Sequence, residues 1–181
     1  ISLNNSLNYL KKDMSLINGV VYKKYKNDKL KYQKTYKDGE LDGLSREWYE
    51  NGQLKIERNI KKRKLNGLWR EWYENGQLKS EWSYIDGEPQ NGIRKNWYKN
   101  GQLKSEWGYK NGKRNGKFKS WYESGQLELE CNFKNGLVNG LGRGWYKNNQ
   151  LKFEANYKNG YVNRSLKKWH KNGMLKTEGE L

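Results

Sequence analysis

The sequence contains very few of the residues on which enzymes and metal proteins depend. Its 181 residues include one cysteine (Cys131), one histidine (His170) and one proline (Pro89). A lone cysteine excludes a disulfide within the chain and a metal site built from several cysteines. No apolar run approaches the ~20 residues of a transmembrane helix, so we expect no membrane-spanning segment.

Acidic and aliphatic residues are also scarce. Asp and Glu number 20 against 37 Lys and Arg, which gives a net charge of +17, and only 33% of the residues are hydrophobic. Such a composition is too polar for a thick globular core. The chain does contain 9 Trp and 14 Tyr, however. Aromatic rings that recur regularly can bury ~150–250 Å² each and stabilise a thin structure.

Regular recurrence is the main feature of this chain. One leucine returns at intervals of 24 or 25 residues, at Leu30, Leu54, Leu78, Leu103, Leu127, Leu151 and Leu175. A fixed period of this length indicates a repeat array. We divide it into residues 19–42, 43–66, 67–91, 92–115, 116–139, 140–163 and a partial unit, 164–181, within an array over 19–181. Residues 1–18 fit the repeat poorly and are interpreted as an N-terminal cap or leader segment.

Each repeat contains two short segments and two turn signals, such as Asn100-Gly101 and Asn111-Gly112. Asn-Gly between alternating residues is a strong hairpin signal, because both residues tolerate positive φ. The fold class we predict is all-β: an elongated, twisted antiparallel β-meander of about seven 24-residue β-hairpin repeats. Alternation along a strand should place Leu103, Ser105, Trp107 and Tyr109 on an apolar face, and Lys104, Glu106 and Gly108 on a charged face.

The loop length decides how the strands align. With two-residue Asn-Gly loops, Tyr49 faces Leu54 and Trp48 faces Lys55, whereas a three-residue loop with a bulge shifts this pairing and exchanges the Trp and Tyr columns. We prefer the first register because opposite charges then face each other, which stabilises a sheet. The six facing pairs are Arg46–Glu57, Arg70–Glu81, Lys95–Glu106, Lys119–Glu130, Arg143–Glu154 and Lys167–Glu178.

The repeated pattern Gly-x4-Trp-Tyr-x-Asn-Gly-Gln-Leu-Lys-x-Glu-x2-Tyr-Lys-Asn-Gly-x2-Asn-Gly resembles the MORN repeat variant (MORN_2) of many bacterial proteins. That family includes YwqK-like proteins labelled as toxin-antitoxin antitoxins. The resemblance covers roughly Gly19 to Glu178 and departs from the pattern at Lys24, Lys62-Arg63, Asn149 and Arg164. It implies a β-hairpin array that binds proteins or, in some relatives, anionic lipids.

Catalytic constellations are absent from the sequence pattern. The recurring glutamates lie ~10 Å apart, two strands per step, which is too far for a carboxylate pair to share one reaction. Serine and cysteine nucleophiles have no histidine base apart from His170. No phosphate-binding loop, metal-ligand cluster or dinucleotide fingerprint occurs. We therefore expect no enzyme activity, no cofactor and no metal.

The charged face carries the candidate binding residues, because each cation stands two residues before a tryptophan. They are Arg46, Trp48, Arg70, Trp72, Lys95, Trp97, Lys119, Trp121, Arg143, Trp145, Lys167 and Trp169. Cation and ring on one side of a strand form a track for a polyanion, an acidic protein or a membrane interface. The structural alternative is that the indoles only cover the sheet beneath Lys and Arg stems, with the glutamates neutralising the column.

The sequence thus favours a non-enzymatic scaffold for protein–protein interaction, possibly antitoxin-like, with another protein as the partner. The alternative is a basic binder of anionic membrane surfaces or other polyanions. Nucleic acid fits less well, because the glutamates interrupt a phosphate-binding track. Open sheet edges also allow end-to-end self-association. The chain begins at Ile1 without methionine, so a bacterial cytoplasmic location and export after leader removal both stay open.

Overall fold

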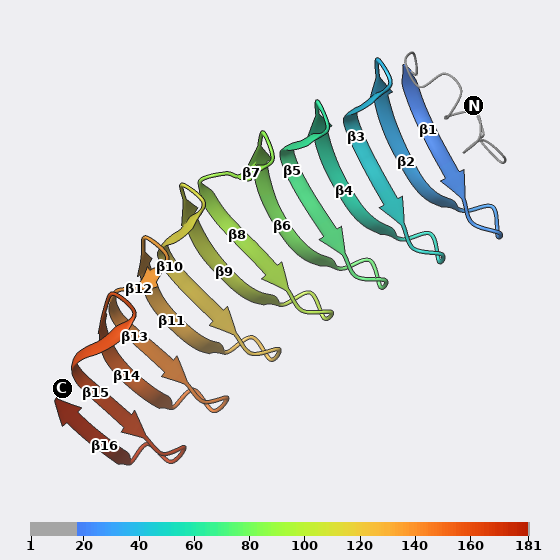
Figure 1. Ribbon diagram of the computed structural model, residues 1–181. Helices are drawn as coiled ribbons and strands as arrows, with labels where there is room; N and C mark the ends of the chain where they lie inside the picture. Colours follow the sequence, from blue (N-terminus) through green and yellow to red (C-terminus); the bar gives the residue numbers. More distant parts are fainter. Residues whose placement is uncertain (1–17, 181) are drawn as a thin grey trace. The chain divides into compact units, whose positions relative to one another are not determined.

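The computed structural model describes residues 18–180, without the side chains of Arg164 and Glu180. The predicted cap over residues 1–18 therefore lies, except for Asn18, outside the described residues. The described chain forms two compact units, 18–89 and 90–180. Both consist of antiparallel strands, and the described residues contain no helix. This confirms the predicted all-β hairpin fold (Figure 1).

The first unit is a meander in which each strand pairs with the next one in the chain. Its strands are β1 (Gly19–Lys24), β2 (Leu30–Lys37), β3 (Glu40–Trp48), β4 (Leu54–Lys61), β5 (Lys64–Trp72), β6 (Leu78–Ile85) and β7 (Glu88–Pro89). The two-residue strand β7 pairs only with the end of β6. Pro89 thus lies in a short edge segment, where the missing N–H group costs little.

The second unit repeats this order. Its strands are β8 (Gly92–Trp97), β9 (Leu103–Lys110), β10 (Lys113–Trp121), β11 (Leu127–Lys134), β12 (Leu137–Val138), β13 (Gly140–Trp145), β14 (Leu151–Lys158), β15 (Tyr161–Trp169) and β16 (Leu175–Glu180). Strand β12 pairs with the end of β11, and β13 then continues along β11. Successive hairpins therefore lie side by side in each unit (Figure 1).

One of the two turns in each repeat is the predicted two-residue hairpin turn. Asn111 and Gly112 have φ angles of 51° and 70°, and the flanking Lys110 and Lys113 pair directly. Positive φ at both positions is the mark of a type I′ turn. Lys62-Arg63, which lacks the Asn-Gly signal, adopts the same conformation with φ angles of 47° and 66°.

The other turn corrects the predicted register. Trp48 pairs with Leu54 rather than Lys55, and Tyr49 does not face Leu54, because the register shifts between Glu47 and Trp48. The Tyr49 N–H group donates to the Gln53 carbonyl (2.9 Å), and the Gly52 N–H group donates to the Tyr49 carbonyl (2.9 Å). This is the three-residue loop with a bulge, in which glycine takes the left-handed position.

The bulge also corrects the predicted faces near this turn. Lys79 is the extra residue opposite Glu71, and its Nζ lies 2.7 Å from Glu71 Oε1. Glu71 and its neighbour Arg70 point to opposite faces of β5. Lys79 therefore lies on the face opposite to the arginine, whereas we had predicted this lysine column on the charged face. The preceding leucine, Leu78, pairs with Trp72.

Tyrosines tie neighbouring repeats together. The Tyr122 hydroxyl, for example, donates to the backbone carbonyl of Trp145 at 2.7 Å. The same bond joins Tyr25 to Trp48, Tyr49 to Trp72, Tyr98 to Trp121 and Tyr146 to Trp169. Each bond contributes about 0.5–1.5 kcal/mol. The regular tyrosine spacing therefore adds a link between hairpins beyond the strand ladder.

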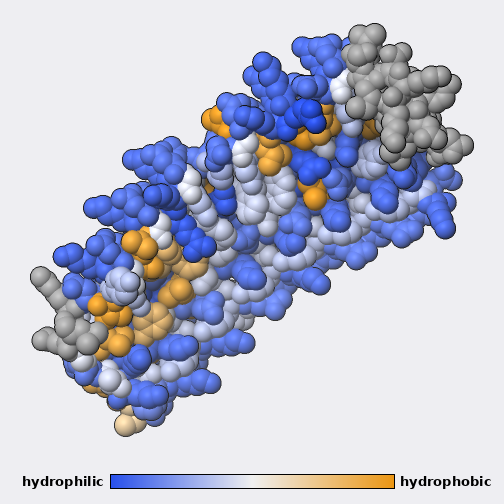
Figure 2. All heavy atoms as spheres, viewed as in Figure 1, coloured by the Kyte–Doolittle hydropathy of each residue, from blue (hydrophilic) through white to orange (hydrophobic). Residues whose placement is uncertain are grey.

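The core is thin and lies on the face opposite to the predicted charged face, which we call the aromatic face. Trp69 and Trp82 stack there with ring centroids 4.7 Å apart. Cys131 is buried. Most of the other aromatic-face side chains are only half-buried. Hydrophobic residues form separate patches on an otherwise hydrophilic surface (Figure 2). The polar composition is therefore consistent with a thin core.

Small residues make room for rings on the aromatic face of the second unit. A Cβ atom on Gly144 would lie 2.3 Å from Cε1 of Phe153, and one on Gly142 would lie 2.9 Å from Cε2 of Tyr157. Neither glycine has a positive φ. Both are therefore required by packing, because the rings of β14 lie over the backbone of β13.

Candidate binding surface

The candidate cations and the glutamates form one column on the charged face of each unit. All six predicted facing pairs are present, from Arg46 opposite Glu57 to Lys167 opposite Glu178. Within the units, four of the glutamates also face the next cation: Glu57 faces Arg70, Glu106 faces Lys119, Glu130 faces Arg143 and Glu154 faces Lys167. We call this alternating column the charge ladder.

Side-chain distances show that the three arginines and Lys167 of the ladder form ion pairs. Arg46 Nε lies 2.7 Å from Glu57 Oε2, and Arg70 Nε lies 2.7 Å from Glu81 Oε2. In the second unit Arg143 approaches Glu154 to 2.6 Å and Glu130 to 4.0 Å. These side chains are partly exposed, so each pair contributes only about 0–1 kcal/mol.

The charge ladder is electrically neutral, so the excess positive charge of the chain lies on residues outside it. Its six cations and six glutamates cancel, so the net +17 of the chain resides outside it. In the second unit, residues 107–122, 131–153 and 155–177 contain no Asp or Glu. The free cations there lie chiefly in the type I′ hairpins and their flanks, for example at Lys110, Lys113 and Lys134. The sequence left open whether the ladder is a cationic track or is neutralised by its glutamates.

The candidate tryptophans end the strands that carry the ladder cations. Trp121, for example, ends β10 and pairs with Leu127, and its carbonyl accepts the Tyr98 hydroxyl. The six tryptophans are all half-buried. Strand alternation from Lys119 to Trp121 predicts cation and ring on one face, and the register shifts between Ser120 and Trp121. Their role in binding stays a prediction.

Lysine and tyrosine also form cation–aromatic pairs. Lys55 Nζ lies 5.5 Å from the centre of the Tyr49 ring, and Lys152 Nζ lies 5.7 Å from that of Tyr146. Similar pairs join Lys31 to Tyr25, Lys79 to Tyr73 and Lys104 to Tyr98. Such contacts are worth about 0.5–1 kcal/mol at exposed sites. The bulge brings these lysines beside the tyrosine rings. The sequence pattern did not reveal these contacts.

Three hollows open on the charged face of the second unit beside the charge ladder. The first, about 390 Å³, lies over Gly108 and is bordered by Ile93, Glu106 and Lys117. Other repeats carry Asn59, Ser83, Asn132 and Asn156 at the position of Gly108. Glycine is required there, because its Cβ would lie 2.2 Å from the Asn115 carbonyl oxygen.

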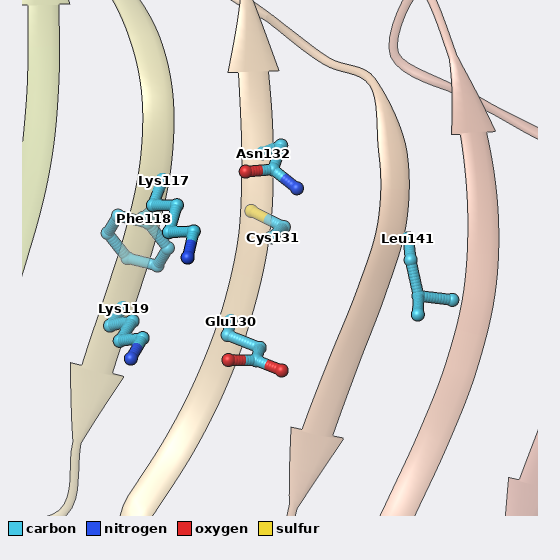
Figure 3. Close-up of a pocket in the computed structure, with 7 residues that line it drawn as sticks. All are labelled: Lys117, Phe118, Lys119, Glu130, Cys131, Asn132 and Leu141. Carbon is cyan, nitrogen blue, oxygen red and sulfur yellow. The ribbon is translucent and has the colours of Figure 1, made fainter.

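The second hollow, about 160 Å³, lies between β10 and β11, with Leu141 of β13 at its border. Lys117 and Lys119 project from one strand, and Glu130 and Asn132 from the next (Figure 3). The third, about 490 Å³, is lined by Lys134, Asn139, Asn156, Tyr157, Lys158, Asn159 and Asn163. Sequence periodicity predicted the charged face but not these hollows. The hollows lie where the side chains of neighbouring strands leave space unfilled, which periodicity does not specify.

The shifted pKa values have structural causes. A hydrogen bond to Glu71 raises the pKa of Lys79, and one to Glu178 raises that of Lys167. Burial raises the pKa of the Cys131 thiol, which disfavours the reactive thiolate. These shifts keep the lysines charged and the cysteine neutral near pH 7. They therefore support ion pairing and packing at these positions.

Two further observations concern residues 18–180. No group of three or more His, Cys, Asp or Glu side chains is arranged there to hold a metal ion. That part of the chain also has no helix of the length and apolar character required to cross a membrane.

The paired strands, the two alternating turns and the bonds between hairpins define a β-hairpin repeat protein. A comparison with protein families matches the MORN repeat variant at residues 17–38, 41–62, 65–86, 90–111, 114–135 and 138–159. The chain belongs to the MORN repeat variant family, whose repeats are generally protein- or membrane-binding modules. A search of the curated proteins finds no match.

Proposed function

We propose that this protein is a non-enzymatic scaffold that binds another protein along the charged face of its second unit. The observation that carries the proposal is the combination of a tryptophan column, the charge ladder and three hollows on one face. Tryptophan and arginine dominate the binding energy of protein interfaces when they pack into pockets on the partner. A neutral ladder beside them favours a partner with matching charges of both signs.

The test is co-purification of a partner with the full chain, followed by substitution of the tryptophans. Trp97→Ala and Trp121→Ala should each weaken the complex by at least about tenfold, as expected for interface anchors. Lys110→Gln, which neutralises a cation in a hairpin turn, should leave the affinity nearly unchanged. Circular dichroism must show that all three variants keep the wild-type fold. Equal losses in the tryptophan and lysine variants would contradict the proposal.

An antitoxin-like role is a specific form of this proposal. It requires a toxic partner encoded beside this protein, and co-expression should restore growth to cells that produce that partner. The Trp121→Ala variant should lose this protection while it accumulates to the same level. Against a nuclease the high positive charge is unfavourable, because immunity to such enzymes is usually expected from an acidic protein. A neighbouring toxin of another class is therefore the expected partner.

The excess positive charge favours a second candidate, a basic binder of anionic membranes or other polyanions. Each Lys or Arg near an anionic bilayer contributes roughly 1 kcal/mol, and salt screens this attraction. Vesicles rich in phosphatidylserine should then bind the chain at low salt and release it as salt rises. Lys110→Gln and Lys113→Gln should weaken this binding more than Trp121→Ala. Binding that is unaffected by salt would exclude this candidate.

A further inference from the structure

The third hollow differs chemically from the other two. Its lining contains two lysines and four asparagines, with Tyr157 between them, and no carboxylate. Lys134 and Lys158 are exposed, and alternation from Glu130 and Glu154 places them on the charged face beside Asn156. The nearby Glu154 carboxylate is held by Arg143 at 2.6 Å. The hollow is therefore a cationic site whose nearest acid is already neutralised.

A hydrogen bond that closes the corresponding place in other repeats is missing here. The Asn18 carboxamide accepts from the Asp38 N–H group at 2.8 Å, and Asn91 accepts from Asn111 at 2.7 Å. Two repeats lie between them: in one, Asp42 accepts from the Lys62 N–H group at 3.0 Å, and in the other the Asn66 carboxamide instead donates to the Asp86 side chain at 3.4 Å. In the three bonds that an N–H group donates, the acceptor lies twenty residues before the donor. Within the described chain, no such bond joins Asn139 to Asn159 or Asn115 to Asn135.

The missing bond leaves polar groups directed at the hollow. Asn139 and Asn159 both line it, and in three other repeats the equivalent side chain accepts from the equivalent N–H group. Asn156 uses its Nδ2 to donate to Ser165 Oγ at 3.3 Å, which leaves its carbonyl oxygen as an acceptor. Carboxamides donate and accept, so they suit hydroxyl groups, whereas the two ammonium groups suit charged oxygens.

We propose that this hollow binds a polyhydroxylated anion, meaning a sugar or polyol ring that carries carboxylate, sulfate or phosphate groups. The lysines pair with the charged oxygens, and the asparagines hydrogen-bond to the ring hydroxyls. The volume of about 490 Å³ falls within the ~300–1,000 Å³ of small-molecule sites. This site is local to β11, β14 and the segments beside them, so it does not depend on the proposed protein partner.

The experiment is a titration of the full chain with each probe, monitored by NMR and calorimetry. The salt concentration is about 0.15 M, which screens long-range charge effects. The probes are a heparin-derived tetrasaccharide and inositol hexakisphosphate, with maltotetraose as the uncharged control. We expect at least one anionic probe to bind and to shift the signals of Asn139, Asn159 and Asn163. A sulfated glycan and a phosphorylated polyol are distinguished by which probe binds. If neither binds, or if maltotetraose binds equally well, the proposal is wrong.

Matched variants separate this site from general charge attraction. Lys158→Gln should reduce affinity by about tenfold or more, because a charged hydrogen bond is lost. Lys110→Gln removes the equivalent lysine two repeats earlier, beside the closed Asn91–Asn111 bond, and should leave affinity unchanged. Equal losses in these two variants would overturn the proposal.

A substitution of Asn139 provides a test that folding defects cannot mimic. In Asn139→Asp the new carboxylate can accept from the Asn159 N–H group, as Asp42 accepts from Lys62. The variant should keep or raise the melting temperature while it loses affinity for the anionic probe by at least about tenfold, since a negative charge now faces the ligand. Undiminished binding by this variant would also refute the assignment.

Discussion

Replacing Gly144 by alanine tests the packing of the aromatic face directly. The added Cβ would lie 2.3 Å from Cε1, 2.8 Å from Cδ1 and 3.0 Å from Cζ of Phe153, whereas ordinary contacts begin near 3.4 Å. The ring must therefore move by about 1 Å, the difference between 3.4 and 2.3 Å. Overpacking of this kind typically costs about 1–3 kcal/mol.

A smaller gain opposes this cost. Alanine reduces the conformational freedom of the unfolded chain, which stabilises the folded state by about 0.4–1 kcal/mol where the backbone allows it. We therefore expect a net loss of about 1–2 kcal/mol. Urea unfolding followed by tryptophan fluorescence should show the midpoint falling by about 0.3–2 M, given a slope of about 1–3 kcal/mol per molar.

Gly179→Ala is the matched control, because a Cβ there meets no atom within 4 Å and the glycine has no positive φ. It should be neutral or slightly stabilising. In a Phe153→Ala background the cost of Gly144→Ala should nearly vanish, since the two residues are in contact and their effects are coupled. The reasoning fails if Gly144→Ala unfolds at the wild-type urea concentration.

The remaining predictions concern single bonds and ionisable groups. Tyr122→Phe removes the hydroxyl that donates to the Trp145 carbonyl and should lower the free energy of unfolding by about 0.5–1.5 kcal/mol, measured in urea. Burial raises the pKa of the Cys131 thiol, so its reaction with a disulfide reagent at pH 8 should be at least about tenfold slower than that of a free thiol until urea unfolds the chain. The hydrogen bond from Lys79 to Glu71 raises the lysine pKa above its ordinary 10.5. The resulting stabilisation is complete below pH 10.5 and is lost as pH rises through the folded-state pKa, so the stability gap to Lys79→Met should close at high pH.

Each of these predictions has an internal control. Tyr161 is 81% exposed, and Tyr161→Phe should leave the urea midpoint unchanged. Lys176 occupies the position of Lys79 in the last repeat and is exposed, so Lys176→Met should show no such pH-dependent gap. Rapid labelling of Cys131 in the folded protein would contradict its buried position. A gap for Lys79→Met that widens above pH 10.5 would contradict the assigned ion pair.

The repeat period and the charge pattern predicted most of the fold. Spacing of two between apolar residues predicted strands, and the type I′ turn followed from pairs such as Asn111-Gly112, because few residues tolerate positive φ at both positions. Opposite charges at a fixed separation predicted the facing of Arg46 and Glu57. These features are local, so a single sequence contains the information needed to predict them.

The bulge beside Trp48 could not be derived from the same pattern. Tyr-x-Asn-Gly-Gln is compatible with a two-residue and a three-residue loop. We had expected opposite-charge pairing to favour the two-residue loop, but Arg46 faces Glu57 in the bulged structure as well. The structure has the three-residue loop, which brings Lys79 beside Glu71. Here the choice depends on how the loop closes against Gln53, which strand alternation does not specify.

The candidate binding surface was predictable only in part. The sequence indicated which strand face carries the cations and tryptophans. It did not indicate that Arg70 and Arg143 each lie near a second carboxylate, because that carboxylate, Glu57 or Glu130, belongs to the preceding hairpin. Nor did it indicate the hollow at Asn139, where a hydrogen bond that three other repeats form is not made.

The sequence by itself determined the repeat, the strand and turn positions, and the separation of charged from aromatic residues, because each depends on residues close together in the chain. Only the tertiary structure decided the register at the bulged loops, the packing of Phe153 over Gly144 and the three hollows. These depend on the distances between side chains of successive hairpins. Such distances are set when neighbouring strands come together, about twenty residues apart in the sequence.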